Sequence, residues 1–224
     1  MQDSARRLTT QARHQVEARW PALLASLASG LLFYALPEYL TIGPGWLLFV
    51  IVAALLIPTT LSQRTGRLDL NQIFAYTTLG VITFAVVSSL TLLILRLPGH
   101  KDPPVQLLRA AAALWVSNVL VFASWYWRLD GGGPNERDKR GVHTDGAFLF
   151  PQMIIDPARR REMGEDTWSP GFVDYLFLAF NTSTAFSPTD VPVLSRWAKV
   201  MMIVQSLISL ATVVLLAARA VNIL

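Results

Sequence analysis

The sequence predicts an all-α, polytopic membrane protein, and three observations lead to this class. Of the 224 residues, 53% are hydrophobic and only 15% are charged, whereas soluble domains carry roughly 25% charged residues. Uninterrupted apolar runs of about 20 residues recur, which is the length a helix needs to cross a bilayer. These runs lack the alternation typical of barrel strands, so helices must satisfy the backbone. We expect about five transmembrane helices plus one shorter, re-entrant segment.

The charge pattern and the residue types exclude several functions. The net charge is +4, but the basic residues lie in the tails and loops between apolar runs, where membrane topology explains them without nucleic acid. The chain has no cysteine, so it has no disulfide and no thiolate site. No Ser/His arrangement, Asp pair or His/Glu metal spacing lies within the spans, so we expect no enzyme, cofactor or metal. The histidines lie in polar segments and are expected on the surface: His14, His100 and His143.

The chain begins with a basic tail, residues 1–20, which we expect to be solvated on the cytoplasmic side. The first span covers residues 21–36 and carries a stripe of small residues that lets another helix approach closely. Its members are Ala22, Ser26 and Gly30. After a Gly-Pro-Gly break, the second span covers residues 46–61, and Pro58 is expected to tilt or end it.

The third span (residues 73–95) and the fourth (residues 107–127) complete a four-helix transmembrane region, residues 21–127. The fourth ends in Trp125-Tyr126-Trp127-Arg128, which is typical of an aromatic belt at the membrane boundary. Residues 128–171 then form one long polar loop. Its apolar tetrapeptide Phe148-Leu149-Phe150-Pro151 predicts a loop that folds back onto the bundle.

The last 53 residues, 172–224, have the order of a pore-loop module. Ser169 and Pro170 indicate a helix start, with Ser169 as a possible cap. The apolar segment that follows spans about 13 residues, or roughly 20 Å as a helix, which is too short to cross about 30 Å of hydrocarbon. A re-entrant segment at residues 172–190 fits that length, and a last helix follows from about 194 to 221.

This order resembles the pore domain of the potassium-channel-like family: an aromatic-rich pore helix, a Thr/Ser pair, a loop that ends in Asp, and an inner helix. The family has Thr-Val-Gly-Tyr-Gly-Asp where this chain has Thr184-Ala185-Phe186-Ser187-Pro188-Thr189-Asp190, one residue longer and without either glycine. The resemblance implies a homo-oligomer that conducts monovalent cations. The pore-loop residues would be Thr182, Ser183, Thr184, Ala185, Phe186, Ser187, Pro188, Thr189 and Asp190.

The missing glycines predict weak selectivity. A potassium filter stacks rings of backbone carbonyls in conformations that glycine allows and a Cβ disfavours. Pro188 fixes its own φ and restricts Ser187, so this loop cannot readily repeat that geometry. Hydroxyl groups, with Asp190 as a cation attractor, are the ligands that remain.

The last helix carries a polar face formed by Gln205, Ser209 and Thr212, which share one side at helical spacing. In the resemblance this face lines the pore. Alternatively, it bonds to the third or fourth span, because a Gln in mid-span needs a partner or water. The sequence leaves both alternatives open.

Two arguments on orientation conflict. If the segments alternate, one side of the membrane carries 13 Lys and Arg residues and is expected to be cytoplasmic. The family plan instead places the loop before the pore helix outside.

The leading hypothesis is an oligomeric, weakly selective cation channel in the cell or inner membrane, with lipid and cations as partners. The alternative is a non-conducting structural or regulatory membrane protein that keeps the pore-loop fold.

Overall fold

The computed structural model describes residues 17–96, 103–140, 143, 146–165, 168–185 and 190–221, without the side chains of 104 and 218–221. Within these ranges the chain is helical and contains no strand beyond one isolated antiparallel bridge between Phe148 and Val193. This confirms the all-α class predicted from the sequence.

Four long helices and the shorter α2 form the body of the protein. They are α2 (Trp20–Leu32), α3 (Leu47–Arg64), α4 (Leu68–Arg96), α5 (Pro104–Leu129) and α10 (Arg196–Val221). The shorter elements are η1 (Phe33–Ala35), η2 (Glu38–Leu40), η4 (Asp130–Gly132), α6 (Pro134–Arg140), α7 (Pro151–Ile154), α8 (Pro157–Glu162) and α9 (Phe172–Ala185).

In the described part of the chain, four helices are long and apolar enough to cross a membrane: α3, α4, α5 and α10. Large apolar side chains on their outer faces are exposed, among them Ile57 (62%), Phe84 (67%) and Leu207 (60%). Exposed apolar surface of this extent is typical of contact with lipid or with another chain. These features indicate a membrane protein. The expected first span is shorter than the other four, since α2 and η1 together cover Trp20–Ala35.

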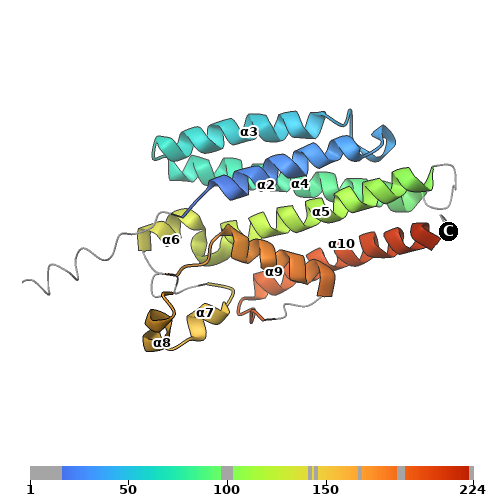
Figure 1. The fold of residues 1–224 in the computed structure, drawn as a ribbon. Coiled ribbons are helices and arrows are strands. Elements are labelled where there is room, and N and C mark those ends of the chain that lie inside the picture. Colours follow the sequence, from blue (N-terminus) through green and yellow to red (C-terminus); the bar gives the residue numbers. More distant parts are fainter. Residues whose placement is uncertain are drawn as a thin grey trace, which may run out of the picture.

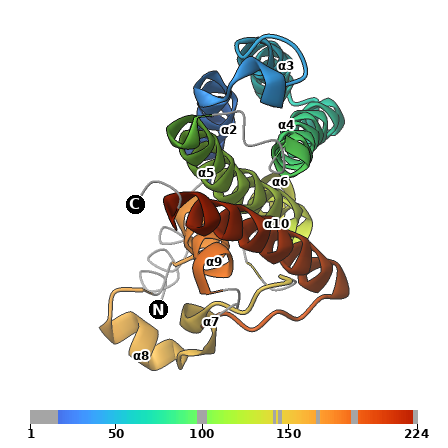
Figure 2. The same cartoon turned by 90° about the vertical axis from the view of Figure 1, so that its right-hand side faces the viewer.

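Helix α5 lies at the centre of the bundle. Figure 1 shows the long helices side by side, and the end view in Figure 2 places α2, α3 and α4 on one side of α5 with α9 and α10 on the other. The reason lies in its small residues: Ala110, Ser117 and Ala123 are fully buried. Small side chains let neighbouring helices approach closely from several directions.

Successive long helices run in opposite directions, so one set of connecting segments lies at the same end of the bundle, which we call the basic end. It contains residues 17–19, the turn between α3 and α4, and the segment from the end of α5 to the start of α9 (Figure 1). Of the 13 basic residues expected on one side, the ten that the structure describes therefore gather at one end.

Helix α3 continues through Pro58 to Arg64, so of the two expected outcomes, a tilt or an end of the helix, the end is wrong. Hydroxyls next to the proline bond carbonyls of the preceding turn: Thr59 donates to the Leu55 carbonyl at 2.7 Å, and Thr60 to that of Leu56 at 3.0 Å. Such bonds let transmembrane helices tolerate proline.

The long polar segment after α5 folds back onto the bundle, as expected. Its apolar residues Phe148 (1% exposed) and Phe150 (3%) are buried, and both pack edge-on against Tyr175 of α9. The loop is therefore part of the core at the basic end.

Candidate functional site

Helix α9 has 14 residues and begins at Phe172, so it measures about 21 Å and reaches only part of the way along α10. The backbone N–H of Gly171 donates to the Asp174 carboxylate at 2.8 Å. This is the reciprocal half of a capping box, in which the third helical residue caps the N-cap N–H. The expected cap, Ser169, is exposed, and the described contacts give it no capping bond.

The chain returns from α9 to the basic end before α10 begins. The N–H of Leu194 donates to the Ala147 carbonyl at 2.8 Å, and the N–H of Leu149 donates to the Pro192 carbonyl at 3.0 Å. These bonds join the returning chain to the folded-back loop near Tyr175. Both ends of residues 172–194 therefore lie at the same end of the bundle (Figure 1).

The predicted pore-loop residues fall into three groups. Thr182 and Ser183 are buried, whereas Thr184 and Ala185 are exposed at the tip of α9, and Asp190 is exposed beyond it. The other predicted members lie outside the described residues: Phe186, Ser187, Pro188 and Thr189. Among the described residues, Thr182 also lines an open groove of about 650 Å³ along α10.

The polar face of α10 is buried inside the chain. Gln205, Ser209 and Thr212 are each 0% exposed. The Gln205 amide nitrogen donates to the Ala179 carbonyl and to the Ser183 hydroxyl, both at 2.8 Å. Its amide oxygen accepts from the Tyr126 hydroxyl at 2.5 Å. One glutamine thus joins α10 to both α9 and α5.

Asn118 of α5 extends this set of bonds. Its amide nitrogen donates to the Ser209 hydroxyl at 2.8 Å and to the Gln205 carbonyl at 3.2 Å, while Thr212 bonds only the Ile208 carbonyl of its own helix at 2.6 Å. We call Asn118, Tyr126, Ser183, Gln205 and Ser209 the central network. The face therefore bonds to the fourth predicted span and to α9, which is the interhelical alternative left open by the sequence.

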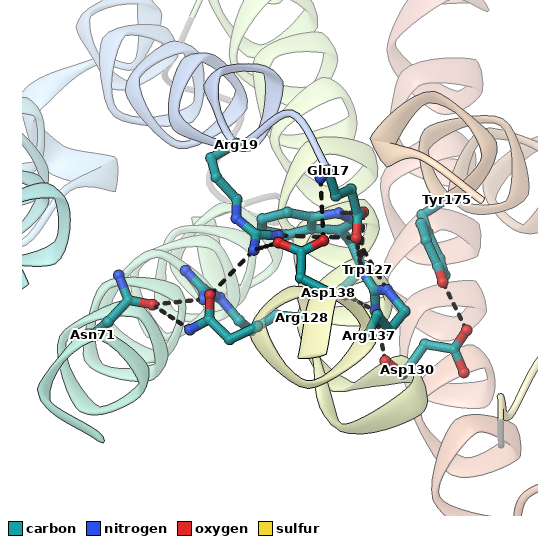
Figure 3. A network of polar contacts seen from close by, with 10 residues as sticks. Glu17, Arg19, Asn71, Trp127, Arg128, Asp130, Arg137, Asp138 and Tyr175 are labelled. Atoms are coloured by element: carbon teal, nitrogen blue, oxygen red, sulfur yellow. Dashed lines mark hydrogen bonds and ion pairs between the residues drawn. The ribbon is translucent and has the colours of Figure 1, made fainter. Parts of the chain in front are cut away.

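A second polar cluster, at the basic end, was not predicted from the sequence. We call its residues the end cluster: Glu17, Arg19, Asn71, Trp127, Arg128, Asp130, Asn135, Arg137, Asp138, His143 and Tyr175. Figure 3 shows Trp127 in the middle, with charged side chains around it. Three guanidinium groups lie 5.2 to 6.0 Å from its ring, those of Arg19, Arg128 and Arg137. The indole is 2% exposed, so its contacts with these cations are shielded from water.

Arg137 is the most completely bonded member of the end cluster. Its guanidinium donates to both carboxylate oxygens of Glu17 at 2.9 Å and to the Trp127 carbonyl at 2.9 Å. The Trp127 indole N–H also donates to Glu17. Because Arg137 and Glu17 are 4% and 12% exposed, this pair ties the start of α2 to α6 in a partly dry environment.

Asp130 ties α9 to the end of α5. Its carboxylate, fully buried, accepts from the Tyr175 hydroxyl at 2.7 Å and from the Ala147 N–H, and it lies 3.0 Å from His143 Nε2. The His143 side chain is 5% exposed, so the expected surface position of this histidine is wrong.

A glycine turn makes the end cluster possible. Gly133 has φ of +89°, and a Cβ there would lie 2.6 Å from the Arg128 carbonyl oxygen. Only glycine fits that close approach. The turn directs α6 back across the end of α5, which brings Arg137 and Asp138 to residues 17–19 (Figure 3).

Two expectations are corrected here. Tyr126 and Trp127 are 0% and 2% exposed, so they do not form a belt facing lipid but bond within the chain. Glu17 and Arg19, expected in a solvated tail, are largely buried. The partners are separated by more than 100 residues, so no spacing pattern could reveal them. The available signal was local: three glycines directly after an aromatic-rich span, followed by a short helix of mixed charge.

The part of the chain described by the structure contains no group of three or more His, Cys, Asp or Glu residues that could hold a metal ion. A scan against protein-family models, a search of curated proteins and a search of solved structures each found no match to this chain.

Proposed function

We propose that this chain is a multi-pass, pore-loop membrane protein whose assembled copies conduct monovalent cations with weak selectivity. The observation that carries the proposal is the course of residues 172–194. A half-length helix starts at the basic end, stops partway along α10, and the chain returns to the same end. Non-helical backbone at membrane depth is tolerated where it is covered by protein or lines water, as in a pore loop.

The pore would lie between copies, because one chain contributes only one such loop. The groups available to it are the exposed Thr184 hydroxyl at the tip of α9 and the exposed Asp190 carboxylate. Gln205 is excluded from this role, since both of its amide N–H groups bond within the chain. An apolar stripe on α10, which includes Ile203 and Leu207, would face the neighbouring copies or the lipid.

The basic end faces the cytoplasm in this proposal, following the positive-inside tendency. The loop then enters the membrane from the cytoplasmic side. In this respect the chain differs from the potassium-channel-like plan, in which the pore helix enters from outside.

The re-entrant course can be tested by labelling, since the natural chain has no cysteine. Single cysteines at Ser169 and Asp190, both exposed, should react with a membrane-impermeant maleimide from the same face of the membrane. A cysteine at the exposed Glu38, in η2 at the opposite end, is the matched control and should react from the other face. Labelling of Ser169→Cys and Asp190→Cys from opposite faces would rule out a re-entrant segment.

Conduction is tested with purified protein in liposomes under matched potassium, sodium and lithium gradients. We expect flux of all three ions within a few-fold of each other, because hydroxyls and a single carboxylate discriminate poorly. Asp190→Asn should lower the flux at low salt more than at high salt, since salt screens an exposed charge. Asp69→Asn is the control. It removes an exposed carboxylate at the start of α4, which lies across α5 from α9 and α10, and it should leave the flux unchanged.

A second candidate function is a non-conducting structural or regulatory membrane protein. The specific observation in its favour is the central network, which fixes α9 against α5 and α10 with no polar side chain of that face left exposed. Absence of flux for every ion, with the labelling pattern of a re-entrant segment retained, would select this candidate over the channel.

A further inference from the structure

A cavity opens at the basic end between α2, α3, α4 and α5, on the side of α5 away from α9 and α10. Its enclosed part measures about 30 Å³. No acidic residue among the described ones lines it, and its polar residues, apart from the indole of Trp127, are Arg19, Ser26, Thr59, Gln63, Thr78, Ser124 and Arg128. The partly exposed Arg19 and Gln63 place the opening at the end of the bundle.

Arg128 supplies a buried cation to this cavity. It is 8% exposed, yet its one hydrogen bond in the described structure goes to the neutral Asn71 side chain at 3.1 Å. No described carboxylate lies within ion-pair distance of Arg128. A buried guanidinium without a counter-charge is costly unless another group neutralises it.

Arg19 supplies a second set of unused donors. Its Nη2 bonds Asp138 at 2.5 Å and Asn135 at 3.2 Å, while its Nε and Nη1 are buried without a hydrogen-bond partner among the described residues. Nη1 lies 3.8 Å from Glu17, beyond hydrogen-bond distance. Burial lowers the pKa of Arg19 even though Asp138 and Glu17 favour its charged form.

The hydroxyl groups in the wall have no hydrogen-bond donor left for an anion. Each of them donates to a carbonyl of its own helix, at 2.7 to 3.0 Å: Ser26, Thr59, Thr78 and Ser124. The donors that remain are the two guanidinium groups and the Gln63 amide. A wall of cationic donors without acids favours an anion with several oxygens, and planar guanidinium groups match phosphate best.

We propose that Arg19 and Arg128 bind a phosphate group in this cavity. The enclosed space holds about two water-sized groups, so phosphate oxygens enter while the rest of the ligand stays at the opening. Two sources share this chemistry, the headgroup of a phospholipid and inorganic phosphate. The headgroup source fits the position, because Trp20 directly after Arg19 is 64% exposed and marks the level of the membrane interface.

The experiment measures binding to the full-length protein in detergent, by calorimetry and by the shift in melting temperature. The probes are inorganic phosphate, short-chain phosphatidylglycerol, and short-chain diacylglycerol, which lacks the phosphate. We expect saturable binding of a phosphate-containing probe and none of diacylglycerol. Binding of the lipid alone assigns the site to a headgroup, and binding of inorganic phosphate as well assigns it to phosphate in general.

Two variants and one control connect binding to the cavity. Arg128→Met should weaken binding at least tenfold. Arg128→Lys should weaken it less, because lysine keeps the positive charge but lacks the planar guanidinium group that donates two parallel hydrogen bonds. Arg64→Gln, which removes an exposed basic residue from the same end of the bundle, should change binding less than twofold. If Arg128→Met does not fold, Arg19→Lys provides the same comparison.

Failure of wild-type protein to bind either phosphate probe would overturn the proposal. An equal loss of phosphate binding in Arg64→Gln and Arg128→Met would also overturn it, because it would show that the probe binds to surface charge in general. The cavity lies across α5 from α9 and α10, so this outcome is separate from that of the flux measurement.

Discussion

The central network and the end cluster both hold helices together, but they use different chemistry. Both join helices through buried polar groups. The central network uses amides and hydroxyls only, with Gln205 as its hub roughly 14 Å along α10. The end cluster uses full charges, with Arg137 and Glu17 as its hub at the end of α5.

The position along the bundle explains the difference. A charge buried far from water is expensive, whereas a neutral amide such as that of Gln205, which bonds through both its nitrogen and its oxygen, costs little. At the end of the bundle, partial access to water lowers the cost of burying a charge, and bidentate ion pairs with further bonds to backbone groups stabilise the charged side chains. The chemistry of these two buried networks therefore follows their distance from the end of the bundle.

Breaking the end cluster should have the largest effect. Arg137→Gln removes the cation that bonds Glu17 directly and leaves only the Arg19 guanidinium at 3.8 Å, and removing one partner of a buried pair costs about 3 to 5 kcal/mol. Unfolding in mixed micelles with increasing denaturing detergent measures this loss. The double variant Glu17→Gln with Arg137→Gln should recover part of it.

Arg159→Gln is the matched control, because Arg159 is exposed on α8. Its cost should stay below about 0.5 kcal/mol, as for most surface substitutions. Equal costs for Arg137→Gln and Arg159→Gln would mean that the Glu17 pair does not form in the membrane-embedded protein.

Breaking the central network should cost less. Gln205→Leu removes three bonds, to Ala179, Ser183 and Tyr126, and each interhelical polar bond in a membrane contributes about 0.6 kcal/mol on average, so the loss should be about 2 kcal/mol. The same unfolding assay measures it. A loss as large as that of Arg137→Gln would contradict the ranking of the two networks. If Gln205→Leu changes the ion flux without changing the stability, Gln205 lines the pore.

The smallest effect is expected at Thr212. Its hydroxyl bonds only the Ile208 carbonyl of its own helix, so Thr212→Val keeps the shape and removes no bond between helices. The stability should change by less than about 0.5 kcal/mol. A larger loss would show that Thr212 contacts a polar group from another helix or another copy.

The helices could be predicted well from the sequence, because apolar length is a direct consequence of bilayer thickness. The spans around 73–95 and 107–127 correspond to α4 and α5, and the short segment from Phe172 corresponds to α9. Of the two outcomes predicted for Pro58, a tilt or an end of the helix, the end is wrong, because α3 continues to Arg64.

The polar sites could be predicted only in part. Helical spacing placed Gln205, Ser209 and Thr212 on one face, since that relation is local to one helix. The direction of the face depends on which helices pack beside it, and a single sequence does not contain that information. The end cluster was missed because Glu17 and Arg137 meet only through the turn at Gly133 and the packing of α2 on α5.

Phe148 has a consequence for how the two polar networks are connected. Its ring lies between Tyr126 of the central network and Tyr175 of the end cluster, with centroid distances of 5.3 and 6.2 Å. No hydrogen bond between the two networks occurs among the described residues, and the side chain of phenylalanine has no polar atom that could supply one. Phe148 thus keeps the charged groups of the end cluster and the neutral amides of the central network apart as two separate polar units.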